Sequence, residues 1–370
     1  MRRRGRRVLV ALLLAACSPA PLPAPAGAPP AAPAPARGAV VHDTVRSAAL
    51  RGNPLGDPAD RHVAVYLPPS YASDPSRRYP TVYLLHGFDG DPAQWTGGRM
   101  RLPEAMDSLV AAGAVREMIV VMPDGKNALG GSFFANSPAT GRWEDFLVRE
   151  VVEHVDRRYR TVPGSKGRGV AGWSMGGHAS LRLAGRHPEV FGAAYALSPC
   201  CLGDLRLDLA PGTEAGPRVW REAAAVRDRA GLAEAPFGAR LALAMAALSP
   251  PDPARPLGIA LPYEAGAEGL VPAEPAHSAW EAVSADSLVA RHGAGLARLS
   301  GIAFDAGTED GFRHIPASTR ALSDALGRAG IPHAWELYAG THGSHVPERL
   351  RTHVLPFFSA RLEAHPSGLR

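Results

Sequence analysis

The stretch GWSMGG, residues 172–177, decides the fold, because it carries the pattern G-x-S-x-G with Ser174 at its centre. Residues 168–173 before it have the composition of a short strand, and residues 177–187 after it have that of a helix. A strand, a tight turn and a helix form a nucleophile elbow, in which the turn raises a serine hydroxyl above the edge of a sheet. The flanking glycines suit this turn because they have no side chain to obstruct its strained backbone. The alternative is a glycine-rich strand-to-helix turn with an ordinary serine.

A serine hydroxyl acts as a nucleophile only when a base removes its proton and an acid orients that base. In chains with this elbow, the acid follows the serine and precedes the base. The expected strand 300–304 is followed by the acidic segment DAGTED. Asp310 is the first candidate for the acid, with Asp305 and Glu309 as alternatives. The non-catalytic interpretation of this segment is a solvated acidic turn.

The base is expected after the last strand, residues 334–338, which is followed by AGTHG. His342 is the first candidate because it follows this strand and a glycine. His345 is the second and His314 the third, and most of the 14 histidines are expected on the surface. Both candidate loops follow the carboxyl ends of strands, where open α/β sheets place their sites.

A second apolar strand-like run, residues 80–85, ends in HGFDG, residues 86–90. A His-Gly pair in this position fits the loop that donates a backbone N–H to a developing oxyanion, and the N–H of Met175 is the expected second donor. Removing one such donor typically costs about 3 kcal/mol of transition-state stabilisation. We interpret His86 as structural, because it precedes the nucleophile and its imidazole would brace the loop.

Six segments carry a resemblance to a known family: YLLHGF (83–88), VVMPDG (120–125), NSPATGRWEDFLVREVVEHVDRRYRT (136–161), GVAGWSMGGHASLRLAGRHPEVFGAAYALSP (169–199), DAGTED (305–310) and YAGTHGSHVPERLRTHVLPFFSARL (338–362). With them the chain resembles the putative-esterase family of α/β hydrolases, which includes esterase D (S-formylglutathione hydrolase), feruloyl esterase domains and mycolyltransferases. The resemblance covers nearly all of residues 60–361.

This resemblance implies a Ser-Asp-His triad in an α/β-hydrolase fold. The family's G-x-x-D acid corresponds to Asp310 and its G-x-H base to His342. Its oxyanion donors correspond to Phe88 and Met175. His345 is a departure from the family pattern, because it is a second histidine three residues after the first. It therefore stays an alternative base.

The N-terminus predicts export. Residues 2–7 contain five arginines, and residues 8–16 form an apolar run that is too short to span a bilayer as a mature helix. The run ends in Leu-Ala-Ala-Cys17, which resembles the lipobox of bacterial lipoproteins. The expectation is a signal peptide over 1–16 and a lipid on Cys17, with anchoring at the periplasmic side of the outer membrane or the cell envelope. A plain signal peptide with an incidental cysteine is the alternative.

Residues 17–38 are rich in Pro and Ala and have no apolar periodicity, so they are expected to form a semi-rigid tether. The alternative is a leader without a spacing role. The esterase domain is expected over 39–362, and residues 363–370 are expected to form a tail.

Composition excludes several classes of function. The formal net charge is +5, but the five leader arginines account for it, so it does not predict nucleic-acid binding. Cys200 and Cys201 are expected to be buried free thiols, because adjacent cysteines rarely bridge each other, and a strained vicinal disulfide is the alternative. No Cys or His lies at metal-ligand spacing from them, so no metal site is predicted. The chain also has no glycine-rich phosphate loop or dinucleotide fingerprint, and no cofactor is expected.

Strands alternate with helices along the chain, which predicts an α/β fold with a mostly parallel sheet and helices on both faces. The pattern stops between residues 202 and 298. We expect this insertion to form a helical cap over the site, and the alternative is a helical pad that covers the sheet edge.

Three functions remain open from the sequence. The first is a serine carboxylic-ester hydrolase that works through a covalent acyl-enzyme. The second is an acyltransferase with the same triad, which differs only in whether water or another alcohol reaches the acyl-enzyme. The third is a non-catalytic, envelope-anchored binding protein on a hydrolase scaffold, because fold alone does not determine function. The expected partners are a small-molecule or carbohydrate ester and a membrane, and the sequence does not predict an oligomeric state.

Overall fold

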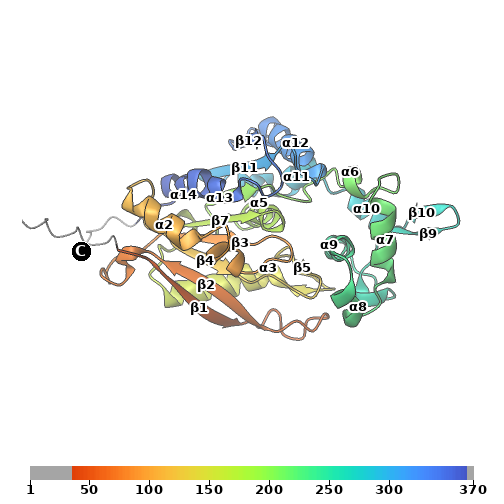
Figure 1. The fold of residues 1–370 in the computed structure, drawn as a ribbon, viewed down its shortest axis with the longest axis horizontal. Coiled ribbons are helices and arrows are strands. Elements are labelled where there is room, and N and C mark those ends of the chain that lie inside the picture. The colour runs from red at the N-terminus through yellow and green to blue at the C-terminus, as the bar shows by residue number, and fades with distance from the viewer. Residues whose placement is uncertain (1–35, 365–370) are drawn as a thin grey trace, which may run out of the picture. The chain divides into compact units, whose positions relative to one another are not determined.

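The computed structural model describes residues 36–364, and an eight-stranded sheet runs through its centre (Figure 1). In spatial order the strands of the sheet are β1 (Ala39–Arg46), β2 (Asp60–Leu67), β4 (Ile119–Pro123), β3 (Thr81–Leu85), β7 (Arg168–Trp173), β8 (Ala193–Leu197), β11 (Gly301–Gly307) and β12 (Ala334–Tyr338). The pairs from β4 to β12 are parallel, whereas β2 is antiparallel to both β1 and β4. The predicted fold class, a mostly parallel sheet with helices on both faces, is therefore confirmed.

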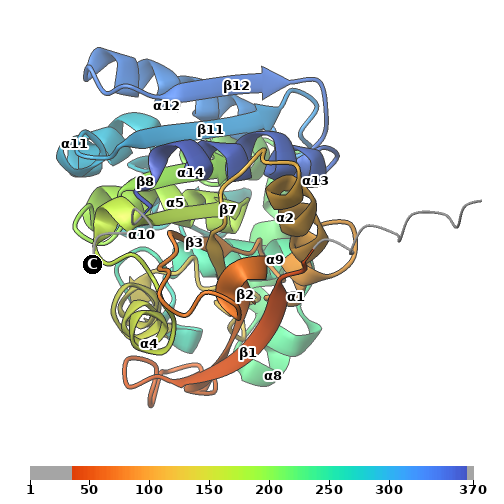
Figure 2. The same cartoon turned by 90° about the vertical axis from the view of Figure 1, so that its left-hand side faces the viewer.

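The central strands are buried along their whole length, as parallel strands covered on both faces must be. Alternate side chains of β3 enter different cores: Val82 and Leu84 face one, and Tyr83 and Leu85 face the other. The first core is covered by α2 (Leu102–Ala111), α13 (Val346–Arg349) and α14 (Leu355–Arg361) (Figure 2).

The opposite face is covered by the remaining helices of the hydrolase pattern, which are α3 (Trp143–Asp145), α4 (Val152–Arg158), α5 (Met175–Arg186), α11 (Ala285–Leu296) and α12 (His314–Arg328). A π-helical turn, Phe146–Val151, joins α3 to α4, so the three segments form one continuous helix with a widened turn. A second such turn, Leu350–Val354, joins α13 to α14. A short helix, α1 (Ala93–Thr96), and a two-residue strand pair, β5 (Asn136–Ser137) and β6 (Gly141–Arg142), lie in the loops.

Two expectations about strands need correction. The strand β1 was not predicted, because its sequence AVVHDTVR lies directly after the Pro/Ala-rich segment and only its inner half is buried. The strand predicted over 300–304 continues to Gly307. Asp305 therefore lies inside β11, hydrogen-bonded on both sides to neighbouring strands, and does not belong to the acidic loop.

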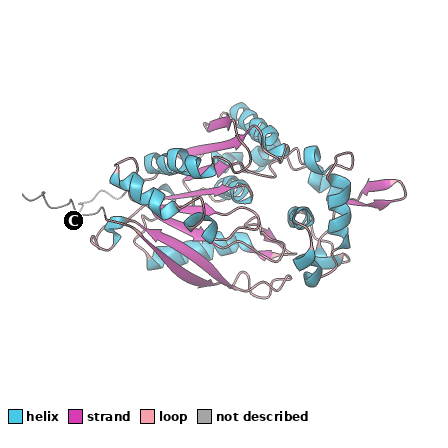
Figure 3. Cartoon of the chain, viewed as in Figure 1, coloured by secondary structure: helices cyan, strands magenta, loops and turns pink. Residues whose placement is uncertain are grey.

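The insertion predicted over 202–298 divides into two parts. Its first part holds α6 (Arg206–Leu209), α7 (Gly216–Ala225), α8 (Arg229–Glu234), α9 (Phe237–Ala246), the hairpin β9 (Tyr263–Gly266) and β10 (Gly269–Pro272), and α10 (Ala276–Glu281). These elements stand away from the sheet at the right of Figure 1, and Figure 3 shows that they are mostly helical. The last helix, α11, instead packs with α5 and α12 on the sheet. We use "cap" below for residues 202–284.

The predicted signal peptide, Cys17 and most of the tether lie outside the described residues, as does the end of the C-terminal tail. Within residues 36–364, no helix has both the length and the apolar character that are needed to cross a membrane.

Candidate active site

Ser174 occupies the turn between β7 and α5, and its backbone is strained. Its φ of 56° and ψ of −114° lie outside the regions that L-residues normally adopt. Three backbone hydrogen bonds hold this conformation. The N–H of Ser174 donates to the carbonyl of Leu197 over 2.9 Å, and its carbonyl accepts from the N–H groups of His178 (3.0 Å) and Cys200 (3.2 Å).

The glycines of the motif are required by close backbone approaches. A Cβ on Gly172 would lie 2.3 Å from the carbonyl carbon of Gly176, and a Cβ on Gly176 would lie 2.2 Å from the carbonyl oxygen of Leu85. Both distances are too short for any side chain. The G-x-S-x-G pattern is thus explained by packing of the turn against β3 as well as by the turn itself.

Asp310 and His342 are joined by a hydrogen bond of 2.7 Å between Oδ2 and Nδ1. The Asp310 side chain is fully buried, and its other oxygen accepts from the N–H of Phe312 over 2.8 Å. The imidazole lies between the rings of Trp173 and Phe312, with both centroid distances at 5.1 Å. Because Nδ1 faces the carboxylate, Nε2 is left to exchange a proton with a reacting group.

The indole of Trp173, the residue before Ser174, donates to the carbonyl of His342 over 3.0 Å. This bond links the end of β7 to the loop after β12. Among the described residues, no hydrogen bond joins the hydroxyl of Ser174 to His342. Hydrogen bonds of this kind are often long in unliganded enzymes and tighten when substrate binds.

The alternative candidates have other partners. His345 is exposed on α13 and bonds to Glu348 over 3.0 Å. Both nitrogens of His314 are engaged, by the carboxylate of Asp208 and by the N–H of Cys201. Glu309 is exposed. Of the sequence-predicted acids and bases, Asp310 and His342 are the pair that the structure brings together.

Asp305 has a structural role that the sequence did not indicate. Its carboxylate accepts from Arg349 Nε and from the hydroxyl of Tyr195, both over 2.7 Å. Burial raises its pKa, although the charge of Arg349 opposes that rise. Arg349 also bonds to Glu336 over 2.6 Å, so one buried guanidinium ties β8, β11, β12 and α13 together.

The two predicted oxyanion donors lie at the start of α5 and in the loop after β3. Met175 is the first residue of α5, where backbone N–H groups have no partner within the helix. In the described residues, neither the N–H of Phe88 nor that of Met175 donates to another protein group. Both are therefore available to a ligand.

His86 braces the Phe88 loop, as the sequence predicted. Its Nε2 accepts from the N–H of Gly125 over 2.9 Å, which leaves Nδ1–H to donate to the carbonyl of Gly87 over 2.8 Å. Burial lowers the pKa of His86, so the imidazole stays neutral and keeps this pair of bonds.

The cap holds the other side of the same loop. Arg240 of α9 forms a two-pronged ion pair with the carboxylate of Asp89, the residue after Phe88. The ring of Phe237 meets the ring of Phe88 edge-on, with a centroid distance of 5.5 Å. Phe237 is one of few large apolar side chains that are exposed in the described chain. These contacts could not be found from sequence, because 148 or more residues separate each pair.

Cys200 and Cys201 are free and buried, as predicted. Burial raises the pKa of the Cys201 thiol, which makes it a poor nucleophile. Among residues 36–364, no group of three or more His, Cys, Asp or Glu side chains is arranged to hold a metal ion.

Solved structures of other proteins share this fold. A ferulic acid esterase aligns with a TM-score of 0.60 and 22% identity, covering 88% of this chain and all of its own. An S-formylglutathione hydrolase from Agrobacterium tumefaciens aligns with a TM-score of 0.55 and 16% identity, covering 88% of this chain and 96% of its own. The fold and the elbow define the protein as an α/β hydrolase.

Sequence comparison then gives the family. Residues 58–365 match the family described as Putative esterase, and the chain belongs to that family. A Mycobacterium tuberculosis protein named as an esterase is 30% identical over 128 residues, which is 30% of this chain and 27% of that protein. An endo-1,4-beta-xylanase/feruloyl esterase of Xylanibacter ruminicola is 34% identical over 92 residues, 24% of this chain and 12% of that protein. The chain thus spans about a quarter or less of the curated relatives it matches.

Proposed function

We propose that this protein hydrolyses carboxylic esters through a covalent acyl-enzyme on Ser174. The observation that carries the proposal is the 2.7 Å hydrogen bond between buried Asp310 and His342, in a chain whose serine occupies a strained elbow. Family membership supports ester hydrolysis as the reaction class.

In this mechanism, Nε2 of His342 takes the proton of the Ser174 hydroxyl as its oxygen attacks the ester carbonyl. The tetrahedral oxyanion is stabilised by the N–H groups of Phe88 and Met175, and the positive end of the α5 dipole adds to that stabilisation. His342 then gives the proton to the leaving alcohol. Water, activated by the same imidazole, releases the acid. Asp310 holds the tautomer throughout and stabilises the imidazolium.

We propose esters of apolar or aromatic acids as the substrates, including hydroxycinnamoyl groups on carbohydrates. Aromatic rings surround two parts of the proposed site: Trp173 and Phe312 contact His342, and Phe237 contacts Phe88 of the oxyanion loop. Flat acyl groups stack favourably on such rings. Ferulic acid esterases among the structural neighbours support the same class.

The test is Ser174→Ala, assayed on p-nitrophenyl butyrate and methyl ferulate. Turnover should fall on the order of 10⁴-fold or more, because the nucleophile is absent. A fluorophosphonate probe should add mass to the wild type and not to the variant. Ser73→Ala, at an exposed loop position, is the matched control and should keep full activity. Probe labelling of Ser174→Ala at the wild-type rate would contradict the assignment.

The location of the enzyme is a separate proposal that rests on the lipobox-like Leu-Ala-Ala-Cys17. We propose that Cys17 is lipidated and anchors the domain in the cell envelope through the Pro/Ala-rich tether. One acyl chain binds membranes only marginally, so stable anchoring requires several. Cys17→Ser should move the enzyme from the membrane fraction or block its processing. Wild-type protein in the soluble periplasmic fraction, cleaved at another site, would contradict the anchor.

A further inference from the structure

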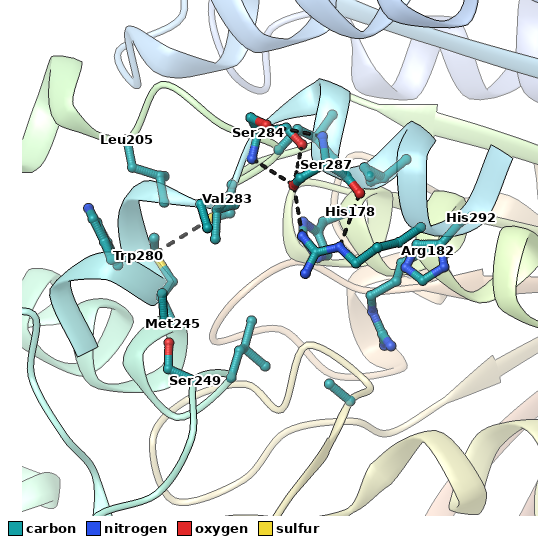
Figure 4. Close-up of a pocket in the computed structure, with 18 of the residues that line it drawn as sticks. His178, Arg182, Leu205, Met245, Ser249, Trp280, Val283, Ser284, Ser287 and His292 are labelled. Carbon is teal, nitrogen blue, oxygen red and sulfur yellow. Dashed lines mark hydrogen bonds between the residues drawn. The ribbon is translucent and has the colours of Figure 1, made fainter. Parts of the chain in front are cut away.

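A cavity of about 440 Å³ lies between the outer face of α5, the cap and α11. We call it the α5 cavity. Its volume falls in the range of small-molecule sites. Figure 4 shows Trp280, Met245 and Leu205 on one side of its space and Arg182 and His292 on the other. Neither Ser174 nor Asp310 nor His342 lines it.

The polar end of the α5 cavity has more positive than negative charge. Three guanidinium groups line it, those of Arg182, Arg186 and Arg291, against the single carboxylate of Glu144. Glu144 already uses both oxygens, since Oε2 accepts from Arg182 and Oε1 accepts from Arg186 and His187. Arg291 bonds only to Ser287 among the described residues. The charged side chains that line the cavity therefore carry a net charge of +2, and Arg186 and Arg291 are exposed.

Two further groups at this end are unsatisfied in the described chain. Nε of Arg182 is buried and has no hydrogen-bond partner. The imidazole of His292 also makes no hydrogen bond, and burial together with the charges of the three arginines lowers its pKa to about 4. Neutral His292 can therefore donate one hydrogen bond without adding charge. The buried Nε of Arg182 is costly to leave unpaired unless a ligand or water satisfies it, whereas His292 is half-buried.

The opposite end is apolar. Trp280, Met245, Leu205, Val283 and Leu288 form its wall, and Trp280 is buried from the other side by the ring of Trp220 at 5.1 Å. A flat aromatic body or a flexible alkyl body fits such a wall, because the flexible side chain of Met245 can adapt its shape to each. The two ends together define an amphipathic occupant with an anionic head.

The catalytic serine is not among the residues that line the cavity. One face of α5 carries His178, Arg182 and Arg186, which are spaced by four residues. From His178 to Arg186 this face extends about 12 Å along the helix axis. Ser174 is one turn before His178. An occupant of the cavity would therefore contact α5 along this face.

We propose that the α5 cavity is a second binding site, which takes a small organic carboxylate with an aromatic or alkyl body. Arg186 and Arg291 hold the carboxylate, His292 donates a hydrogen bond to it, and the body lies against Trp280 and Met245. We assign binding and no reaction to this site, because burial raises the pKa of Cys201, the thiol that lines it.

Calorimetry with 3-phenylpropionate and dodecanoate on the full protein tests this site. The neutral probe 3-phenylpropionamide should bind at least tenfold more weakly than the acid, and acetate should show no binding because it lacks the body. Arg186→Gln and Arg291→Gln should each weaken the acid about tenfold, since a charged hydrogen bond is worth roughly that factor. The matched control Arg298→Gln, an exposed arginine directly after α11, should not change affinity.

A second variant and a mapping step keep the result decisive. Ser249→Phe places a ring at the cavity wall from the loop after α9, and it should abolish binding while thermal stability stays near wild type. A dodecanoate probe with a diazirine on its chain should cross-link to peptides that contain Met245 or Trp280. Equal affinity for acid and amide would overturn the proposal. So would cross-links confined to peptides with Trp173 or Phe312, which would place the acid at the catalytic site; this outcome leaves the proposed ester hydrolysis untouched.

Discussion

Helix α5 contributes to two regions that are built in opposite ways. At its N-terminal end, the Ser174 site is held by directed backbone bonds and by one carboxylate–imidazole pair. Along its outer face, the α5 cavity gathers three guanidinium groups around one carboxylate. The first region holds the backbone of Ser174 in one strained conformation. The second region creates a positive electrostatic potential, to which a range of anions can bind.

The difference teaches where each region is vulnerable. Changes near Ser174 should alter rate and leave stability nearly constant, because few of its groups are buried charges. Changes in the Glu144 cluster should alter stability and leave the chemical step nearly constant. The four variants below test this division.

The largest effect is expected at the base. His342→Ala should lower kcat/KM for p-nitrophenyl butyrate on the order of 10³-fold or more, because only the oxyanion donors and substrate binding remain. His345→Ala is the matched control, since this histidine is exposed and paired with Glu348. Its effect should be less than a few-fold. Equal losses of kcat/KM in the two variants would mean that the rate depends on the structure of the loop and not on the imidazole of His342.

A smaller effect, on stability, is expected from Glu144→Gln. Burial disfavours the charge of Glu144, yet the hydrogen bond from His187 and the charges of Arg182 and Arg186 outweigh burial and hold its pKa well below the usual range. Loss of the carboxylate leaves Arg182 buried without a counter-ion, which should cost about 3–5 kcal/mol of unfolding free energy. Urea denaturation measures it.

The control for that variant is Glu153→Gln, which breaks an exposed pair with Arg157. It should cost less than about 1 kcal/mol. An unchanged urea midpoint for Glu144→Gln would show that the Glu144 cluster does not stabilise the fold. A large loss of kcat in folded Glu144→Gln would contradict the separation of rate and stability between the two regions.

The third prediction concerns pH. Burial and the nearby charge of Arg182 lower the pKa of His178 to about 4. The unfolded chain, with an ordinary value near 6.5, binds the proton first as pH falls. Stability from this group is therefore complete above about pH 6.5 and decreases as pH falls toward 4. Between pH 6.5 and 5 the loss should be about 2 kcal/mol. His178→Gln should flatten this part of the profile, whereas His345→Gln should not.

The smallest effect is expected at Phe237, which packs on Phe88 from the cap. Phe237→Ala should raise KM for methyl ferulate a few-fold and leave KM for p-nitrophenyl acetate unchanged, because an aromatic pair is worth about 1 kcal/mol. Arg298→Ala, at an exposed position after α11, is a suitable control. An equal change for both substrates would show that the cap positions the oxyanion loop and does not contact the acyl group.

Most of the sheet could be predicted from sequence, because its buried strands are short apolar runs that end in turn residues. β7 and β12 have the expected bounds, and β3 begins one residue after the start of the expected run. β11 extends three residues beyond its prediction because Asp305 is an acidic residue inside a buried strand, and only Arg349 and Tyr195 make that position tolerable. Local sequence does not contain those partners.

The candidate catalytic residues could also be proposed from sequence, since each follows a strand in a short motif. The cap and the α5 cavity could not. The cavity joins Glu144, Arg182, Met245, Trp280 and His292, which belong to five separate elements without a shared motif. The sequence indicated helices there but did not indicate that α11 belongs to the sheet layer and the other helices to the cap.

The buried ion pair of Asp305 and Arg349 bears on adaptation to temperature. His342 lies on a loop whose two ends, β12 and α13, are both fixed by this one arginine. The conformational freedom of the His342 loop is therefore determined by Arg349, about one helical turn after the loop ends, and not by His342 itself. Substitutions around Arg349 should lower thermal stability and make the His342 loop more mobile at low temperature. They would do so without changing any residue that contacts substrate.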